Sequence, residues 1–366
     1  MFNLVDFDYV NEKDRKLTEL FLSPKTTTKK YILGINKLSK SILKHIEVDG
    51  IIDDFSRVQK SRKKSVLSID EVPKDSIILS ASIGSPLEVK NTLDARGYTN
   101  FNYLSFYRYS KLDLAEPPFI LDFEDDFTQH HDDYAYLYDL LEDAESKEVF
   151  TKVLNFKISF DLDFMQGFTN NHEEQYFDKE IIPEIKDICF VDGGAYVGDT
   201  LPQIIKNFAD YKKIYAIEPN NLHINIAKRD FGDVRDIEFV NCGLGSSKEI
   251  TTSSIDANQN NCDHNYHATN IDTIDNIVKE KVDFIKLDIE GAEQEAIDGA
   301  KETIKKYKPI LAICIYHKAE DWYKIPQKVL DIESEYKVYL RHYMEGIFET
   351  VMYFIPSNYK GDGSPV

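Results

Sequence analysis

Short apolar runs alternate with helical patterns in the first third of the chain. Each run is bounded by polar or turn residues, as expected of buried strands. A helix is predicted over 38–47, and a second one begins after Ser85, where Pro86 suits the first turn and Glu88 completes a capping box. Gly97 marks the end of that helix. Together these elements indicate a small parallel α/β unit. Its predicted strands are residues 30–33, 48–52, 76–81 and 102–107.

The pattern changes at Glu116-Pro117-Pro118, where two prolines interrupt it. The acidic run 122–126 and the segment 130–133 look like a solvated connection. Apolar residues at helical spacing over 136–157 then predict a helical bridge. We therefore expect a Rossmann-like α/β domain over 1–115, an acidic linker with the helical bridge over 116–180, and a second α/β domain over 181–366.

The second domain has a longer and more regular strand pattern than the first. Its last two strands are separated by too few residues for a crossover helix, so they should pair antiparallel. Five parallel strands followed by an antiparallel hairpin is the chain order of Class I methyltransferases, whereas a dinucleotide-binding fold would continue with further βα units. The expected fold is therefore α/β with a mostly parallel sheet. The predicted strands are 188–192, 213–218, 237–241, 282–288, 309–316, 336–341 and 350–355.

Composition narrows the choice of partners. The formal net charge of -20 opposes binding to nucleic acid or to an anionic membrane, both of which attract Lys and Arg. Nucleic acid is therefore not an expected partner. The basic run 57–64 is interpreted as a solvated loop. Hydrophobic residues make up 42% of the chain, which is enough to fill two packed cores.

The sequence also predicts where the protein works. Residues 1–10 lack a cationic segment followed by an apolar core, so no signal peptide is expected, and no stretch approaches the roughly 20 apolar residues that cross a bilayer. The cysteines show no CxxC spacing, which is typical of reduced thiols in a cytoplasmic protein. No metal is predicted, because Asp263, His264 and His267 lie in a polar loop. The cysteines are Cys189, Cys242, Cys262 and Cys314.

A glycine-rich turn follows the first strand of the second domain. Small residues let the backbone pass close to a ligand, although a structural turn would also explain them. GxGxxG is absent, and carboxylates flank the turn, so a pyrophosphate there would be repelled by about 4 kcal/mol per close charge pair. S-adenosylmethionine has no phosphate and carries an ammonium and a sulfonium cation, so it suits the turn. The sequence reads Asp192-Gly193-Gly194-Ala195-Tyr196-Val197-Gly198-Asp199-Thr200.

Two later strand ends complete the predicted cofactor site. Glu218, followed by Pro219, closes the second strand, and an acid there can accept both hydroxyls of a ribose, as it does for NAD. A strand-end carboxylate exposed to solvent is the alternative. Asn241 and Cys242 close the third strand, where residues that contact adenine would lie.

The fourth strand places Lys286, Asp288 and Glu290 on one side of the sheet. Charged groups rarely enter a central strand without partners. Asp288 and Glu290 should face the cofactor methyl group and the acceptor, whereas a structural network of Lys286 with its neighbouring acids is the alternative. His317 ends the fifth strand and is a candidate base for a hydroxyl proton, although a lone histidine is often structural.

From about Asp143 to Pro356 the sequence resembles the FkbM family of S-adenosylmethionine-dependent methyltransferases. The most specific motif is Lys286-x-Asp288-x-Glu290-Gly291. One departure is Tyr196, where many Class I methyltransferases have glycine. The similar stretches are Phe190–Thr200, Ala216–Asn220, Ile271–Ile274, Phe284–Glu293 and Tyr316–Pro326.

The resemblance implies O-methylation (EC 2.1.1.-), often of a hydroxyl on a sugar, a nucleotide-sugar or a surface-glycan precursor. Separately, the first region looks like a degenerate Rossmann-type domain of the kind found ahead of some glycan-modifying enzymes. Gly34 lacks companion glycines there, so a packing or homodimer module is favoured over nucleotide binding. The FkbM resemblance places Asp192, Gly194, Gly198 and Glu218 at the cofactor. It places Asp288, Glu290 and His317 near the reacting hydroxyl.

Two other functions stay open at this point. An NAD-dependent sugar oxidoreductase is compatible with Glu218, although Asp192, the missing GxGxxG and the terminal hairpin oppose it. A non-catalytic interaction protein that keeps only the fold would tolerate alanine at Asp288 or His317.

Overall fold

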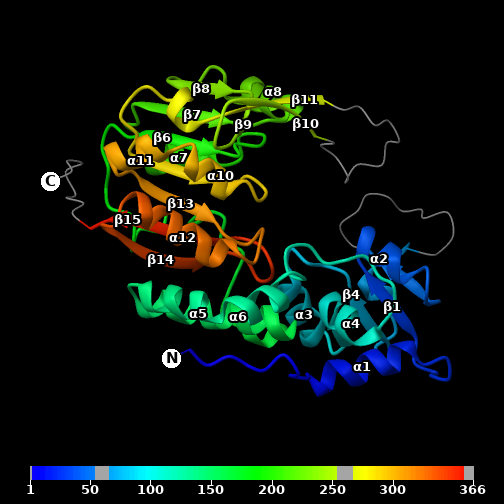
Figure 1. Cartoon of the computed structure of the whole chain (residues 1–366). Coiled ribbons are helices and arrows are strands. Elements are labelled where there is room, and N and C mark those ends of the chain that lie inside the picture. The colour runs from blue at the N-terminus through cyan, green and yellow to red at the C-terminus, as the bar shows by residue number, and fades with distance from the viewer. Residues whose placement is uncertain (1, 54–65, 254–266, 358–366) are drawn as a thin grey trace. The chain divides into compact units, whose positions relative to one another are not determined.

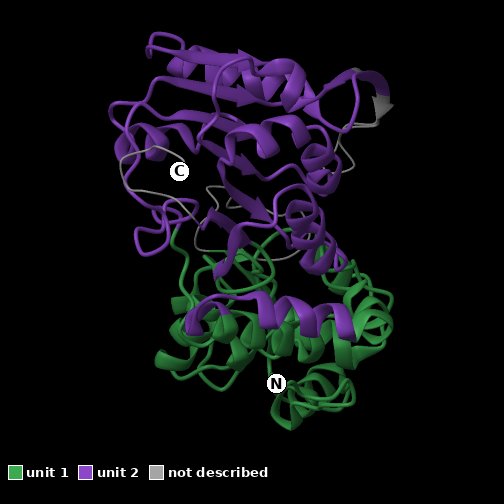
Figure 2. Ribbon diagram, turned by 60° about the vertical axis from the view of Figure 1, so that its left-hand side comes forward, with its two compact units in different colours: residues 1–131, 147–171, 342–348 green, residues 132–146, 172–341, 349–366 purple. Residues whose placement is uncertain are grey.

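The computed structural model describes residues 2–53, 66–253 and 267–357. The chain divides into two compact units (Figure 2). The predicted basic run 57–64 and Cys262, Asp263 and His264 lie outside the described residues, as does the side chain of His267. Unit 1 comprises residues 1–131, 147–171 and 342–348, and unit 2 comprises 132–146, 172–341 and 349–366.

Unit 1 is built on a parallel sheet with the strand order β3-β2-β1-β4-β5. The strands are β1 (Lys30–Leu33), β2 (Gly50–Ile52), β3 (Val66–Leu67), β4 (Ile77–Ser80) and β5 (Thr99–Asn102). The helices are α1 (Glu12–Leu22), α2 (Lys37–Ile42), α3 (Pro86–Ala95) and α4 (Tyr103–Ser110), and α5 (Phe123–Leu140) and α6 (Ala144–Ser159) each cross a boundary between the units.

Both faces of this sheet are covered by apolar side chains. Successive residues of a strand point to opposite faces. Ile32 accordingly packs in one core with Leu38, whereas its neighbour Tyr31 packs in a second core with Ile78. The predicted parallel α/β unit is confirmed, and it explains why its strands are apolar without strict alternation.

Three expectations for unit 1 are wrong in detail. The helix predicted over 38–47 ends at Ile42. Residues 103–107 are helical, because the side chain of Asn102 accepts a hydrogen bond from the backbone N–H of Ser105 at 3.0 Å and starts α4 after β5. The predicted capping box at α3 is also absent. Ser85 makes no capping hydrogen bond, and the backbone N–H of Glu88 donates instead to Glu345 at 2.7 Å.

The acidic segment 122–133 is not a loop, since most of it lies in α5. Three acids in the first turn of α5 favour a helix start, because carboxylates are stabilised at the positive end of the helix dipole. The predicted bridge over 136–157 is two helices, α5 and α6. Asp143 begins the second by accepting from the backbone N–H of Ser146 at 2.7 Å. The three-domain division predicted from the sequence stays a prediction.

Unit 2 contains a seven-stranded sheet with the order β14-β15-β13-β12-β6-β7-β8 (Figure 1). Strands β8, β7, β6, β12 and β13 are parallel, and β15 runs antiparallel to β13. All seven strands were predicted, with ends shifted by at most two residues. They are β6 (Cys189–Gly193), β7 (Lys213–Ile217), β8 (Ile237–Val240), β12 (Phe284–Leu287), β13 (Ile310–Cys314), β14 (Tyr336–His342) and β15 (Thr350–Pro356).

A second, three-stranded sheet of unit 2 has the order β10-β11-β9 and was not predicted. Its strands are β9 (Gly243–Leu244), β10 (Glu249–Ser253) and β11 (His267–Asp272). The helices of unit 2 are α7 (Leu201–Asn207), α8 (Asn221–Phe231), α9 (Ile274–Ile277), α10 (Glu293–Asp298), α11 (Lys301–Tyr307) and α12 (Asp321–Ile332).

The centre of the large sheet is packed with aromatic side chains. Phe190 of β6 and Phe284 of β12 are register partners, and their rings stack with centroids 4.6 Å apart and planes at 11°. This packing fixes β6 against β12, so the segments that leave their carboxyl ends meet. In the described part of the chain, no helix combines the length and the apolar composition that crossing a membrane requires.

Candidate active site

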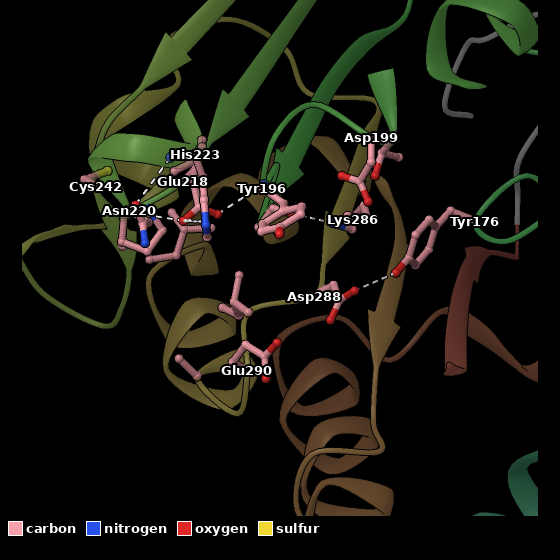
Figure 3. Close-up of a pocket in the computed structure, with 18 of the residues that line it drawn as sticks. Tyr176, Tyr196, Asp199, Glu218, Asn220, His223, Cys242, Lys286, Asp288 and Glu290 are labelled. Carbon is pink, nitrogen blue, oxygen red and sulfur yellow. Dashed lines mark hydrogen bonds and ion pairs between the residues drawn. The ribbon is translucent and has the colours of Figure 1, made fainter. Parts of the chain in front are cut away.

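A cavity of about 990 Å³ lies at the carboxyl ends of the central strands of unit 2 (Figure 3). Sites for small molecules in open parallel sheets occupy this edge. The predicted site residues that line it are Gly194, Asp199, Thr200, Glu218, Pro219, Cys242, Lys286, Asp288 and Glu290. The predicted residues that do not line it are Asp192, Gly193, Ala195, Gly198, Asn241 and His317.

The glycine-rich turn after β6 is folded tightly against its neighbours. The backbone N–H groups of Gly194 and Ala195 both donate to the carbonyl oxygen of Ile217 at 3.0 Å. Gly194 has a φ of 80°, and a Cβ atom there would lie 1.8 Å from the carbonyl oxygen of Asp288. Only glycine fits this position, so the close approach joins the turn to the end of β12.

Replacing Gly194 with alanine is expected to destabilise unit 2 by about 2–3 kcal/mol, the sum of the left-handed backbone and the clash. Thermal unfolding measures the effect. Gly97 is a matched control, because its φ is 79° and a Cβ atom there would have no neighbour within 4 Å. Gly97→Ala should therefore cost only about 1–2 kcal/mol. Equal losses of stability in the two variants would contradict the close approach of Gly194 to the carbonyl oxygen of Asp288.

Glu218 follows β7 and is held by two backbone hydrogen bonds. Its Oε1 accepts from the N–H of Asn220 at 2.8 Å, and its Oε2 accepts from the N–H of Tyr196 at 3.1 Å (Figure 3). A carboxylate oxygen has two lone-pair sites, so each oxygen retains one for a ligand. The side chain of Asn241 donates to the backbone oxygens of Glu218 and Pro219, at 2.9 and 3.0 Å. Asn241 thus supports this turn.

Asp192 and Lys286 form a buried ion pair behind the turn. Their side chains are 0% and 2% exposed, and Lys286 Nζ lies 3.1 Å from Asp192 Oδ1. Nζ also donates to the carbonyl oxygen of Gly194 at 2.9 Å. Burial alone would lower the pKa of Lys286, but Asp192 and Asp288 raise it well above its usual value. Lys286 therefore stays protonated and neutralises Asp192.

Asp288 is the polar centre of the cavity wall. Two tyrosine hydroxyls donate to it. That of Tyr176 donates to Oδ2 at 3.0 Å (Figure 3), and that of Tyr316 donates to Oδ1 at 3.3 Å. The side chain is 23% exposed, so a ligand can still reach it. Burial raises the pKa values of both tyrosines well above the usual value, so both hydroxyls keep their protons.

His317 lies directly behind Asp288 and is only 1% exposed. Its Nε2 lies 3.6 Å from Asp288 Oδ1 and 3.8 Å from Glu290 Oε2. Its Nδ1 lies 3.0 Å from Glu293 Oε1. Burial alone would lower the pKa of His317, but Glu293 and the other carboxylates raise it above the usual value. Of the two residues, Asp288 lines the cavity and His317 does not.

Several site residues were missed by the sequence prediction. Tyr176 and Gln175 lie in the segment interpreted as a linker, and no pattern marked them. Glu349 lies before β15, and burial raises its pKa to about 7. Glu293 stands three residues after Glu290 at the start of α10, a spacing that could have indicated it.

Two side-chain groups among the described residues have ligand atoms close enough to hold a metal ion. They are Asp288, Cys314 and Glu349, and Asp288, Glu293 and His317. Cys314 already contacts the hydroxyl of Tyr176 at 3.3 Å, and Glu293 accepts from the N–H of Ile289 at 2.9 Å. These hydrogen bonds account for both groups without an ion, so no metal is assigned.

Comparison with known proteins adds a family match. Residues 192–343 match the family model described as the methyltransferase FkbM domain. No curated protein matches the chain. A crystal structure of methyltransferase FkbM from Methylobacillus flagellatus KT is similar over 97% of this chain and 94% of that one, with a TM-score of 0.74 and 21% identity. This likeness shows that the two chains share a fold.

More distant likenesses extend only over about half of this chain. A putative methyltransferase from Streptococcus mutans, in complex with SAH, covers 47% of this chain and 90% of its own at 14% identity and a TM-score of 0.32. Aeropyrum pernix fibrillarin, with natively bound S-adenosyl-L-methionine, covers 48% and 69% at 12% identity and a TM-score of 0.32. TM-scores this low carry no argument about function.

Proposed function

We propose that the cavity of unit 2 binds S-adenosylmethionine and that the protein transfers the methyl group to a hydroxyl of a sugar, a nucleotide-sugar or a glycan precursor. The match of residues 192–343 to the methyltransferase FkbM domain supports the methyl transfer. The observation that carries the proposal is the polar wall of the cavity. Two acids, Glu218 after β7 and Asp288 after β12, line one cavity, where Glu218 would bind the ribose and Asp288 would face the acceptor.

The charges around the cavity favour a cationic cofactor. Among the described residues that line it, the acids outnumber the permanent cations, and Lys286 is already paired with Asp192. A diphosphate would therefore meet carboxylates without a free cation to bind it, which is unfavourable by Coulomb's law. A nucleoside with ammonium and sulfonium charges would be attracted instead. The lining acids are Asp199, Glu218, Asp288, Glu290 and Glu349.

Glu218 is suited to the ribose of the cofactor. The backbone N–H groups of Tyr196 and Asn220 fix its carboxylate in place before a ligand arrives, and each oxygen keeps an acceptor site. Two hydroxyls on adjacent carbons can then donate to the two oxygens. Cys242, which also lines the cavity after β8, lies where the adenine would pack.

Asp288 and His317 are suited to the acceptor hydroxyl. Bound S-adenosylmethionine would supply an electrophilic methyl group, and the attacking oxygen must lose its proton. Asp288 lines the cavity and would accept the hydrogen bond of that hydroxyl. The proton would pass through Asp288 to His317, whose Nε2 lies 3.6 Å from Asp288 Oδ1. Because Tyr176 and Tyr316 hold Asp288 from two sides, the carboxylate is already oriented for this task.

Isothermal titration calorimetry tests the cofactor assignment. We expect the wild-type protein to bind S-adenosylmethionine or its demethylated product and not to bind NAD. Binding of NAD alone would favour the sugar oxidoreductase, and binding of neither would leave a non-catalytic interaction protein. Homodimer formation and a cytoplasmic location remain predictions from the sequence.

Replacing Glu218 with glutamine is expected to weaken the binding of S-adenosylmethionine by about 10- to 100-fold, because charge-assisted hydrogen bonds to the ribose are lost. Calorimetry measures the change. Glu238→Gln is the matched control, since Glu238 is exposed on β8 and pairs with Lys213 at 2.8 Å. Unchanged affinity in Glu218→Gln would exclude its role at the ribose.

A further inference from the structure

We propose that Glu293 is a positioning residue that keeps a proton on Nδ1 of His317, so that the lone pair of Nε2 faces Asp288, the residue that would contact the acceptor hydroxyl. This inference rests on the proposed methyl transfer. It gives a role to Glu293, a buried acid that would not itself contact a ligand.

Glu293 is placed by the sharp turn between β12 and α10. Glu290 has a φ of 57° and Gly291 a φ of 97°, so the chain reverses directly after β12. The reversal brings Glu293 beneath the strand end, where it is 0% exposed. Its Oε1 accepts from the backbone N–H of Ile289 at 2.9 Å, and this bond fixes the side chain.

The fixed carboxylate oxygen selects one tautomer of the imidazole. Glu293 Oε1 lies 3.0 Å from His317 Nδ1. An ionised carboxylate can only accept, so the nitrogen beside it is the one that carries the proton. Nε2 is then the basic nitrogen. It lies 3.6 Å from Asp288 Oδ1, on the side of the ring that faces the cavity wall.

Charge strengthens this arrangement. Carboxylates face the imidazole from the end of β12 and from α10. The side chain of Glu290 is 80% exposed, so solvent screens its charge, whereas that of Glu293 is 0% exposed and is not screened. Asp321 of α12 and Glu349 before β15 interact with the ring at longer range. The negative surroundings stabilise the imidazolium that proton transfer would create.

Nitrogen-15 NMR of histidine-labelled protein tests the proposal without a known acceptor. The His317 signals are identified as those missing from His317→Gln. In the wild type we expect the tautomer protonated at Nδ1 and a pKa above the usual histidine value. In Glu293→Gln, which keeps the size and an acceptor oxygen for Ile289, that pKa should fall by about one to two units.

Glu290→Gln is the comparison variant, because it also removes one carboxylate near the ring but at a screened position. Its effect on the pKa of His317 should be the smaller of the two. A wild-type ring protonated at Nε2, or an equal pKa in Glu293→Gln and the wild type, overturns the proposal. Calorimetry on the same samples separates the two levels of inference, since failure to bind S-adenosylmethionine would refute the proposed function and not the tautomer.

Discussion

Replacing Lys286 with methionine is expected to lower the free energy of unfolding of unit 2 by about 3–5 kcal/mol, because Asp192 would be left as a buried charge without a partner. The pair is nearly inaccessible, at 2% and 0% exposure, so water cannot replace the lost ammonium group. Methionine fills a similar volume, so little of the loss in stability should come from an empty space in the core. Thermal unfolding should show the transition lowered by roughly 6–20 °C.

Two further variants isolate the charge in this prediction. Lys213→Met breaks the solvent-accessible pair with Glu238, whose side chains are 27% and 49% exposed, and should cost less than about 1 kcal/mol. Adding Asp192→Asn to Lys286→Met removes the unpaired charge, so the double variant should recover part of the lost stability. If the single variant unfolds at the wild-type temperature, the ion pair does not hold the turn.

Replacing Asp288 with asparagine is expected to lower the rate of methyl transfer by about 10²- to 10⁴-fold while the affinity for S-adenosylmethionine stays nearly constant. An amide accepts the hydroxyl proton poorly and carries no charge to share with His317. The release of S-adenosylhomocysteine, measured with any sugar hydroxyl that the wild type methylates, gives the rate. Glu295→Gln, an exposed position on α10, is the control that should keep full activity.

The pH dependence of this reaction follows from His317. The ring must be neutral to receive a proton, and its pKa is raised above the usual value near 6.5. Activity in the wild type should therefore increase with pH through a midpoint above that of an ordinary histidine. A rate that stays level between pH 6 and pH 9 would show that His317 does not receive the proton.

The prediction of buried strands was reliable because a buried strand is visible in the local sequence as a short run of apolar residues. Strand β1 was located without error, and the ends of the seven large-sheet strands shifted by two residues or fewer. Prediction from the local residue pattern was wrong where a polar side chain determined the backbone conformation. Asn102 starts α4 by accepting from Ser105, and the first-turn acids of α5 stabilise a helix in a run that looked like a solvated loop.

The strand ends of the candidate site were also predictable, because parallel strands bring their carboxyl ends to one edge. The glycine turn, Glu218 and Asp288 were placed there by sequence, and the structure brings them around one cavity. The glycines of the turn were expected to let the backbone pass close to a ligand. At Gly194 the structure shows a further reason, because an added Cβ atom would lie 1.8 Å from the carbonyl oxygen of Asp288.

By itself, then, the sequence determined which segments pair and which residues end them. Only the tertiary structure decided what each charge does, because partners distant in sequence set it. Lys286 neutralises Asp192 across two neighbouring strands, and Tyr176 reaches Asp288 from 112 residues away. His317 is likewise buried behind Asp288, beside Glu293, which is distant from it in sequence. Charge interactions depend on distance and burial in space, and neither can be obtained from spacing along the chain.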